Sequence, residues 1–254
     1  MTDTHRRRLL LRMAAALSAP GLAGRARAQV ATEASLPARG DITTGMQATI
    51  TRIATSQPLV ALTFDDGPHP GLTPQLLDIL SAYGVRATFY VIGSRAVRHP
   101  RLVARIAAEG HEIGNHTWSH PSLHGYSNAG ALSQVDRTSR AVIEATGRMP
   151  VTFRPPYGDF YSHQRLMLFQ SRGMPTVFWS VDPEDWRRPG SDVVASRIVM
   201  RSRPGDIVLA HDIQGPTVRA MPATIEGLVA RGFRFATVSE LIGWPNWQQR
   251  RLRV

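Results

Sequence analysis

Beyond Pro58, short apolar runs alternate with longer stretches in which apolar residues recur every three or four positions. The short runs are typical of buried strands and the longer stretches of amphipathic helices, the pattern of repeated β/α units around a parallel sheet. Strands are predicted at residues 59–62, 87–92, 111–114, 152–153, 176–180, 206–210 and 235–238, with one more short strand between 47 and 53. Helices are predicted at 73–83, 100–108, 129–146, 163–171, 191–201 and 217–231.

About seven such units fit between residues 58 and 242. A regular eight-stranded β/α barrel usually takes about 250 residues, which is more than this stretch holds. We therefore predict an α/β fold in the form of a distorted, incomplete (β/α) barrel. Its first helix is expected to have Thr73 as its N-cap, Pro74 at its first position and Gly84 at its end.

Residues 1–28 have the order of an export signal. A basic group at 5–8 precedes a weakly apolar stretch, and Ala26-Arg27-Ala28 satisfies the small-x-small rule for cleavage before Gln29. The run Arg-Arg-Leu-Leu-Leu-Arg at 7–12 also resembles the twin-arginine export motif, which implies transport in the folded state. We expect an exported protein, periplasmic or extracellular, with no integral membrane segment in the mature chain; a basic cytoplasmic N-terminus is the alternative.

Composition and charge limit the kinds of partner that the protein is expected to bind. The formal net charge is +11, of which residues 1–28, with six Arg and one Asp, account for +5. The remaining +6 is scattered and no zinc-finger or aromatic RNA-binding pattern accompanies it, so nucleic acid is not an expected partner. Residues 29–57 are predicted to be a linker and 243–254 a basic C-terminal tail. Because cysteine is absent, any metal must be held by His, Asp or Glu.

Two adjacent carboxylates, Asp65 and Asp66, follow the strand predicted at 59–62 and precede a Gly-Pro turn. In a β/α protein the carboxyl ends of the strands carry the loops that gather catalytic residues. Adjacent acids repel each other there unless a cation or a shared proton compensates them, and a metal ion is the obvious compensator. The alternative is an Asx-type turn in which one Asp caps the next helix.

His116 and His120 are four residues apart, a spacing that on a helical turn would place both imidazoles on one face, as a metal pair requires. With Asp66 as third ligand they would leave an open coordination position for water, which is the arrangement of a catalytic site. Taken alone the spacing is a weak signal, because surface histidines produce it by chance.

Five segments, each at a predicted strand end, resemble the motifs of the polysaccharide deacetylase family, also called carbohydrate esterase family 4 or the NodB-homology domain. In chain order they are Thr-Phe-Asp-Asp-Gly-Pro at 63–68, His-Thr-x-x-His at 116–120, Arg-Pro-Pro-Tyr-Gly at 154–158, Asp-Pro-Glu-Asp-Trp at 182–186 and Leu-Ala-His-Asp at 209–212. The resemblance covers about residues 58–241, and a catalytic domain is expected at 58–242.

The resemblance implies a metal and a base. Asp66, His116 and His120 would bind a divalent ion, zinc first and Co²⁺ or another ion as the alternative. Asp65 would be the general base. Arg154 would hold this carboxylate ionised and oriented, since an opposite charge nearby lowers the pKa of an Asp; an ordinary surface ion pair is the alternative for Arg154.

Further roles follow from the same resemblance. His211 would protonate the departing amine, with Asp185 keeping it cationic, whereas a lone His after an apolar strand is more often a buried structural residue. The backbone N–H of Tyr157 would stabilise the oxyanion. Trp186 and Leu209 would form the walls of the pocket for the acetyl methyl group, with simple core packing as the alternative. No role is assigned to two further acids of the motifs, Asp182 and Asp212.

The function expected from these residues is metal-dependent removal of N-acetyl groups from N-acetylhexosamine in a β-1,4-linked glycan, either peptidoglycan or chitin. An O-acetyl esterase acting on xylan and a hydrolase of cyclic imides or ureides are the enzymatic alternatives. A catalytically inactive carbohydrate-binding protein is the alternative of another class. A monomer with an acetylated glycan as its partner is expected.

Overall fold

The structure is a computed structural model that describes residues 48–244. Its main sheet is parallel and has the strand order β4-β3-β2-β6, with β7 also paired to β2. These strands are β2 (Leu59–Asp65), β3 (Thr88–Val91), β4 (Glu112–Asn115), β6 (Asp206–His211) and β7 (Arg234–Phe235). The predicted export signal, most of the predicted linker and nearly all of the predicted C-terminal tail lie outside the described residues.

Two shorter strands and several single-residue bridges continue the sheet into an irregular ring. β1 (Thr49–Ile50) pairs in parallel with β5 (Thr176–Val177). Phe153 bridges both Asn115, the last residue of β4, and Thr176, and Val181 bridges Val208 of β6. The chain therefore leads from β4 back to β6 through poorly paired segments, and the expectation of a distorted, incomplete barrel is confirmed.

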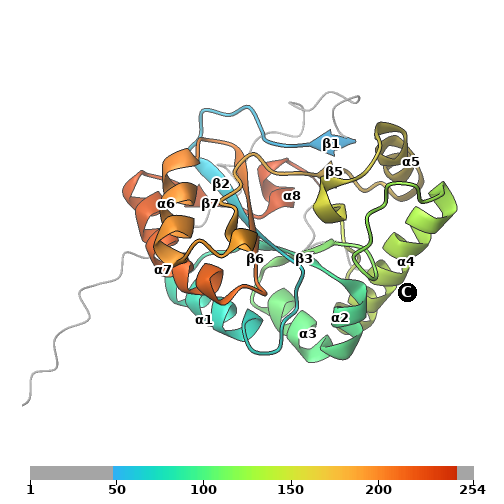
Figure 1. Ribbon diagram of the computed structural model, residues 1–254, viewed down its shortest axis with the longest axis horizontal. Helices are drawn as coiled ribbons and strands as arrows, with labels where there is room; N and C mark the ends of the chain where they lie inside the picture. Colours follow the sequence, from blue (N-terminus) through green and yellow to red (C-terminus); the bar gives the residue numbers. More distant parts are fainter. Residues whose placement is uncertain (1–47, 245–254) are drawn as a thin grey trace, which may run out of the picture.

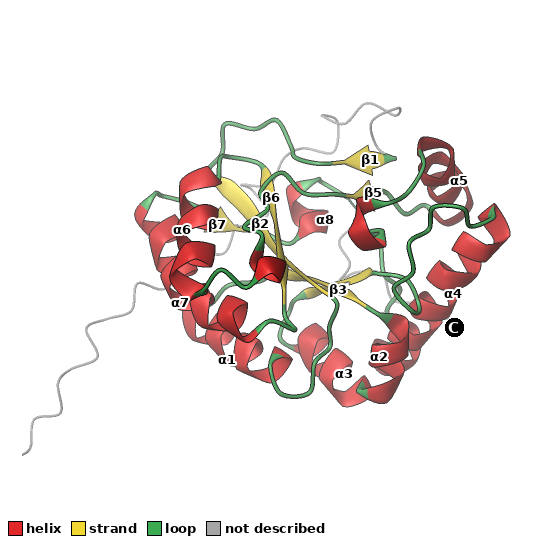
Figure 2. Ribbon diagram, viewed as in Figure 1, coloured by secondary structure: helices red, strands yellow, loops and turns green. Residues whose placement is uncertain are grey.

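Helices surround this sheet (Figures 1 and 2). They are α1 (Thr73–Tyr83), α2 (Gly93–Arg98), α3 (Pro100–Ala108), α4 (Asn128–Thr146), α5 (Ser162–Arg172), α6 (Ser191–Arg201), α7 (Gly215–Ala230) and α8 (Val238–Leu241), with two short 3₁₀ turns, η2 (Pro156–Gly158) and η3 (Asp185–Arg187). Between residues 48 and 244, no helix combines the length and the apolar character that crossing a membrane would require.

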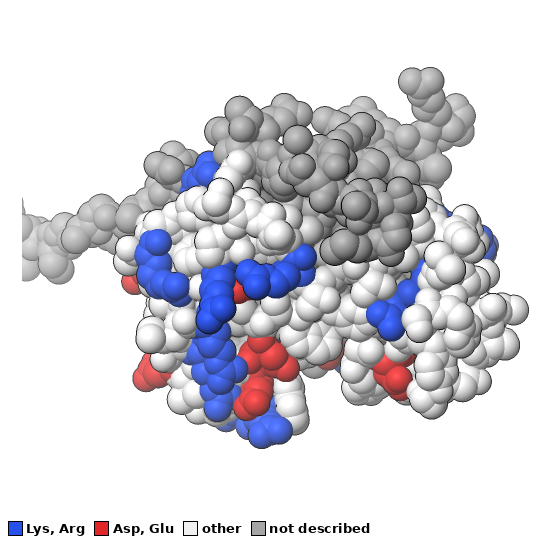
Figure 3. Space-filling view, turned by 90° about the horizontal axis from the view of Figure 1, so that it is seen from above, with Lys and Arg blue, Asp and Glu red and all other residues white. Residues whose placement is uncertain are grey.

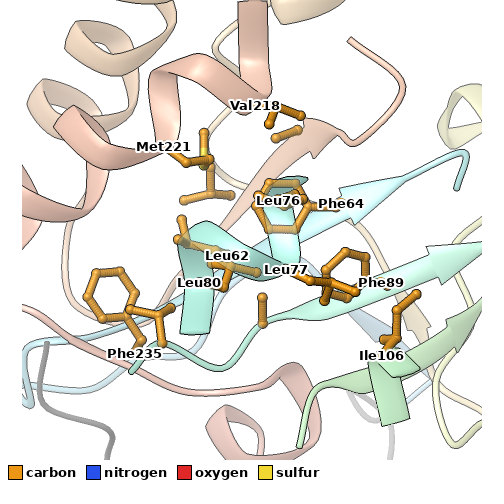
Figure 4. Close-up of a cluster of buried hydrophobic side chains, with 14 of the residues drawn as sticks. Leu62, Phe64, Leu76, Leu77, Leu80, Phe89, Ile106, Val218, Met221 and Phe235 are labelled. Atoms are coloured by element: carbon orange, nitrogen blue, oxygen red, sulfur yellow. The ribbon is translucent and has the colours of Figure 1, made fainter. Parts of the chain in front are cut away.

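The core lies between the sheet and its helices. All seven residues of β2 are buried, which explains why this strand begins as an unbroken apolar run and not as an alternating one. Leu62 and Phe64 on one face of β2 meet Leu76 and Leu80 of α1 in the buried cluster drawn in Figure 4. Phe64 also packs on Phe89 of β3, with 5.4 Å between the ring centroids. The strand that ends at Asp65 is thus packed against both α1 and the neighbouring strand β3.

The helices predicted at 100–108 and 191–201 have the expected bounds, and Gly84, in the left-handed conformation, ends α1. Several other predictions need correction. β2 extends through Asp65, so this acid is part of the strand and does not follow it. Residues 152–153 make only bridges, because Phe153 meets its neighbours at a single point. The strand predicted at 235–238 stops at Phe235, since Thr237 caps a helix that begins at Val238.

Two errors concern the helix starts. α2 was not predicted because its six residues are too few to show a helical period. The N-cap of α1 is Leu72, and Thr73 is already helical. The Thr73 hydroxyl accepts the His69 N–H at 2.8 Å and donates to Asp212, so a tertiary contact replaces the predicted cap.

Charge on the surface is mixed. Figure 3 shows Arg side chains gathered over the side where α6 and α7 lie in Figure 1, with Asp and Glu among them. One such pair joins Arg197 and Glu184 at 3.1 Å. Alternating charges of this kind give no single basic stripe on that face.

Candidate active site

A pocket of about 520 Å³ lies at the carboxyl ends of the strands. Asp65 ends β2 and His211 ends β6, and the two residues are paired in register, so their side chains start from neighbouring strand ends. Eight of the ten predicted site residues line this pocket: Asp65, Asp66, His116, His120, Tyr157, Trp186, Leu209 and His211. The other two, Arg154 and Asp185, are buried behind Asp65 and His211.

Asp66, His116 and His120 form a group that could hold a metal ion, because one ligand atom from each lies within 4.8 Å of the others. Asp66 Oδ1 is 3.0 Å from His120 Nε2 and 3.5 Å from His116 Nε2. This oxygen is buried and has no hydrogen-bond partner among the described residues. Burial raises the pKa of Asp66, but the two imidazoles outweigh it and hold the pKa well below its usual range. An ionised carboxylate with two imidazole nitrogens is a donor set that suits Zn²⁺ and similar ions.

The two histidines come from a loop and not from the helical turn that their spacing suggested. Thr117 and His120 have φ values of 66° and 59°, in the left-handed region. Side chains hold this loop: the Thr117 N–H donates to Asn115 Oδ1 at 3.0 Å, and the His120 N–H to Thr117 Oγ1 at 3.1 Å. His116 Nδ1 lies 2.7 Å from the Arg154 carbonyl oxygen, so this nitrogen carries the proton and Nε2 is free to bind a cation.

Arg154 is not a surface residue. Its side chain has 0% exposure, and Nη1 donates to Asp65 Oδ1 at 2.8 Å and to Thr63 Oγ1 at 2.6 Å. Nε and Nη2 donate to the carbonyl oxygens of Val177 and Phe178 at 3.1 and 2.9 Å. With one Asp65 oxygen taken by Arg154, the other, Oδ2, is 3.8 Å from His116 Nε2 and faces the candidate metal group. Arg154 therefore binds one oxygen of Asp65, and the other lies beside the candidate metal group.

His211 has a buried acidic partner. Its Nδ1 is 2.7 Å from Asp185 Oδ1, and Asp185 Oδ2 accepts the His211 backbone N–H at 2.8 Å and the Thr217 hydroxyl at 2.7 Å. Burial alone would lower the pKa of His211, but the hydrogen bond and charge of Asp185, with smaller contributions from Asp65 and Asp66, raise the pKa to about 9. The imidazole is therefore cationic at neutral pH, although a divalent cation beside Asp66 would offset the two smaller contributions.

The remaining predicted residues form the wall of the pocket. Tyr157 has a φ of 61°, is 71% exposed, and its ring centroid is 4.8 Å from that of His120. Trp186 is 51% exposed, which excludes simple core packing for its side chain, whereas Leu209 is buried. The structure adds four lining residues that sequence reasoning had not assigned to the pocket, namely Pro155, Trp179, Asp182 and Gln214.

The two acids without an assigned role have structural ones. Asp182 Oδ1 accepts the Glu184 N–H at 2.7 Å, which shapes the turn that leads into η3 and Asp185. Asp212 is fully buried and accepts the Thr73 hydroxyl, and it also faces Gly67 closely: a Cβ on Gly67 would lie 2.3 Å from Asp212 Oδ2. Burial, with the charge of Asp66, raises the pKa of Asp212 to about 7 against the opposing hydrogen bond from Thr73. Asp212 therefore joins the loop after β6 to the loop that carries Asp66.

The fold and the site together define a class of protein. It is an incomplete β/α barrel with an Asp-His-His group at its strand ends, and this group lies between a buried Asp–Arg pair and a buried His–Asp pair. The family model for polysaccharide deacetylases matches residues 52–177. A chitooligosaccharide deacetylase of Sinorhizobium fredii is 40% identical over 199 residues, which are 73% of this chain and 92% of the relative. The chain belongs to the polysaccharide deacetylase family.

Other relatives are longer than this chain. The peptidoglycan-N-acetylglucosamine deacetylase PgdA of Listeria monocytogenes is 40% identical over 184 residues, but these cover 72% of this chain and 39% of PgdA. Among solved structures, the Bc1960 peptidoglycan N-acetylglucosamine deacetylase has a TM-score of 0.77 at 32% identity, over 81% of this chain and 99% of that one. The similarity also extends to BA3943, a family pseudoenzyme from Bacillus anthracis, with a TM-score of 0.73 at 30% identity, over 77% and 69% of the two chains.

Replacing Gly67 by Ala tests the contact with Asp212. The φ of Gly67 is not left-handed, so the cost should come from the new Cβ, whose three nearest atoms all belong to the Asp212 carboxyl group. We expect a loss of about 1–3 kcal/mol in the free energy of unfolding, measured by denaturant titration.

Gly71→Ala is the matched control, because its Cβ would meet nothing closer than 3.7 Å. In the double variant Gly67→Ala/Asp212→Ala the added methyl group should cost much less than it does beside the intact carboxyl group. If the two losses simply add, Asp212 is not what requires a glycine at position 67.

A second prediction concerns the pH dependence of activity. A group with a raised pKa keeps its proton up to that pKa, so an activity that needs cationic His211 should fall as the pH rises through about 9. Asp185→Asn removes the charge that raises this pKa, and the fall should move to lower pH. The measurement is the alkaline limb of kcat/KM for acetate release. Thr217→Val, which removes a hydrogen bond to Asp185 but not its charge, should move the limb less; an unchanged limb in Asp185→Asn would reject the pairing.

Proposed function

We propose that this chain is a metal-dependent deacetylase that hydrolyses the N-acetyl group of an N-acetylhexosamine residue in a β-1,4-linked glycan. The observation that carries the proposal is the position of the Asp66–His116–His120 group in a pocket with Asp65 and His211, two residues paired in register across β2 and β6. A proton acceptor and a proton donor thus flank the same small space. Amide hydrolysis needs both, since water must lose a proton and the amine must gain one.

The residues have distinct tasks. When bound by Asp66, His116 and His120, a divalent cation, zinc by preference, supplies Lewis acidity and makes a water more acidic. Asp65 takes the proton of the attacking water, and Arg154 holds this carboxylate in place. His211, held cationic by Asp185, gives its proton to the nitrogen as the carbon–nitrogen bond breaks. The products are acetate and the free amine of the sugar.

The residues of the pocket wall bind the acyl group. The backbone N–H of Tyr157 donates to the oxygen on which negative charge develops. Trp186 and Leu209 surround the acetyl methyl group. An acetyl group is small, and a pocket with one exposed indole and one buried aliphatic side chain suits it.

The glycan is proposed from the relatives. Their names refer to peptidoglycan and to chitooligosaccharides, both of which are β-1,4-linked and contain N-acetylglucosamine. The export signal at 1–28, the linker at 29–57, the catalytic domain at 58–242 and the tail at 243–254 belong to the same proposal, as does a monomeric state. Export makes wall peptidoglycan or environmental chitin the substrates within reach.

An inactive binding protein is the second candidate, because BA3943 is a family pseudoenzyme. Against it stands the full set of groups at this site: three ligands, a paired base and a paired acid. The test is acetate release from chitin oligomers, peptidoglycan and acetylated xylan, together with ring opening of small cyclic imides, with the protein loaded with zinc. Release from the first two supports the proposal; release from xylan or ring opening of the imides supports the enzymatic alternatives, and no reaction supports the binding protein.

A third prediction divides the labour between the adjacent acids. Asp66→Ala should lower the bound metal, because a three-ligand site that loses one ligand holds its ion poorly. Asp65→Asn should retain the metal and the fold but lose about 10²–10⁴ in rate, since it lacks the proton acceptor. Elemental analysis and acetate release on the same samples provide the measurement.

Asp78→Asn is the control, because Asp78 is 70% exposed and paired only with Arg105 at the surface. It should leave both metal and rate unchanged. Near-normal activity in Asp65→Asn with full metal would show that Asp65 is not the base. If Asp66→Ala still binds its full amount of metal, Asp66 is not a ligand and the two adjacent acids only form a turn.

A further inference from the structure

Exposed aromatic side chains gather near the pocket. Among residues 48–244, the exposed rings of Phe, Tyr and Trp belong to Tyr126, Tyr157, Tyr161 and Trp186. Tyr157 and Trp186 line the pocket itself. Tyr161 lies only four residues beyond Tyr157 and has no part in the proposed chemistry, yet 41% of it is exposed.

Tyr161 belongs to a second histidine–tyrosine pair outside the first. His120 and Tyr157 have ring centroids 4.8 Å apart at the pocket, and His124 and Tyr161, each four residues further along its chain segment, have centroids 4.5 Å apart. His163 extends the arrangement, since its ring stacks on that of Tyr161 at 5.5 Å with an angle of 18° between the planes. Four extended residues span at most about 14 Å, so the outer pair must lie close to the pocket.

Polar contacts hold the outer pair in place. The Tyr161 hydroxyl is hydrogen-bonded to His124 Nε2, and His124 Nδ1 is 3.4 Å from Asp159 Oδ1. The Ser122 hydroxyl donates to the other oxygen of Asp159. All of these groups are on loops, and each loop is anchored by a buried apolar residue of one shared cluster, Leu123 and Phe160.

Rings that are held in place and exposed to water are suited to a ligand with apolar faces and polar edges. Water around an exposed ring is released when the ring is covered, which favours a partner that covers it. A pyranose has carbon–hydrogen faces that cover a ring, and hydroxyl groups at its edge that bond to phenol, imidazole or carboxylate. A metal ion is a poorer candidate for this place, because the metal-binding group found among the described residues is that of Asp66, His116 and His120.

We propose that Tyr161, His124 and His163 form a sugar-binding subsite, called here the aromatic strip, for a hexosamine unit that lies beyond the immediate neighbour of the one being deacetylated. The strip continues the pocket through Tyr157, so a single glycan chain crosses both. This inference rests on the proposed function and adds to it which residues bind the glycan outside the pocket, so that affinity grows with chain length.

The experiment compares chitooligosaccharides from dimer to hexamer. Tyr161→Ala should raise KM for the pentamer and hexamer about 3–10-fold, the value of one aromatic contact. The values of kcat for all lengths and KM for the dimer should stay near those of the unchanged protein, since the dimer does not need the strip. Tyr161→Phe keeps the ring and should restore most of the affinity for the long oligomers.

Met200→Ala on α6 is the control for loss of an exposed apolar side chain, because Met200 is 75% exposed and away from the pocket lining. Thermal unfolding of each variant separates a loss of fold from a loss of binding. Equal losses for dimer and hexamer, or no loss at any length in Tyr161→Ala, would overturn the aromatic strip.

A binding measurement tests this inference independently of the proposed function. Calorimetric titration of Asp65→Asn with the hexamer measures affinity without turnover, and adding Tyr161→Ala should weaken it about 3–10-fold. If acetate is released but Tyr161→Ala causes no length-dependent loss of affinity, the proposed function stands and the aromatic strip is rejected. If binding depends on chain length but no oligomer releases acetate, the aromatic strip stands and the proposed function is rejected.

Discussion

The buried ion pair between Arg154 and Asp65 is the constraint on which the site depends. A buried guanidinium needs hydrogen-bond partners, and here each of its three nitrogens has at least one: together they bind one carboxylate, one hydroxyl and two backbone carbonyl oxygens. Removing one partner from a buried pair typically costs about 3–5 kcal/mol, because the other charge is left uncompensated. The pair therefore joins β2 to the segment before η2 that carries Arg154, and it determines which oxygen of Asp65 faces the pocket.

The same arginine also orients the candidate metal group. Its backbone carbonyl accepts from His116 Nδ1, so the side chain of Arg154 orients Asp65 while its main chain selects the tautomer of His116. On the far side of the pocket, Asp185 does for His211 what Arg154 does for Asp65. An acidic and a basic side chain, each held by a buried partner of opposite charge, thus lie at neighbouring strand ends, which is the arrangement that the proposed proton transfers require.

The loops around this centre are irregular for a physical reason. Asp66, Thr117, His120 and Tyr157 all have positive φ, which costs free energy for residues other than glycine and persists only where the surroundings enforce it. The side chains of Asn115 and Thr117, which accept backbone N–H groups of the loop, and the close approach of Asp212 to Gly67 provide that enforcement. The strain turns short chain segments so that ligand atoms from different loops converge.

Local sequence determined the elements and the place of the chemistry. The apolar run before Asp65 predicted a buried parallel strand, glycine and proline marked the ends of α1, and the order of five motifs at strand ends predicted the fold and eight of the pocket residues. Hydrophobic period and turn chemistry are properties of residues close together in the sequence, so they can be recognised in a single sequence. What only the tertiary structure decided is long-range: Arg154 is fully buried and binds two backbone carbonyl oxygens besides Asp65, Thr73 meets Asp212 instead of capping its helix, and His120 reaches Asp66 from a left-handed loop. Register, burial and backbone strain arise when distant segments pack, and no local pattern encodes them.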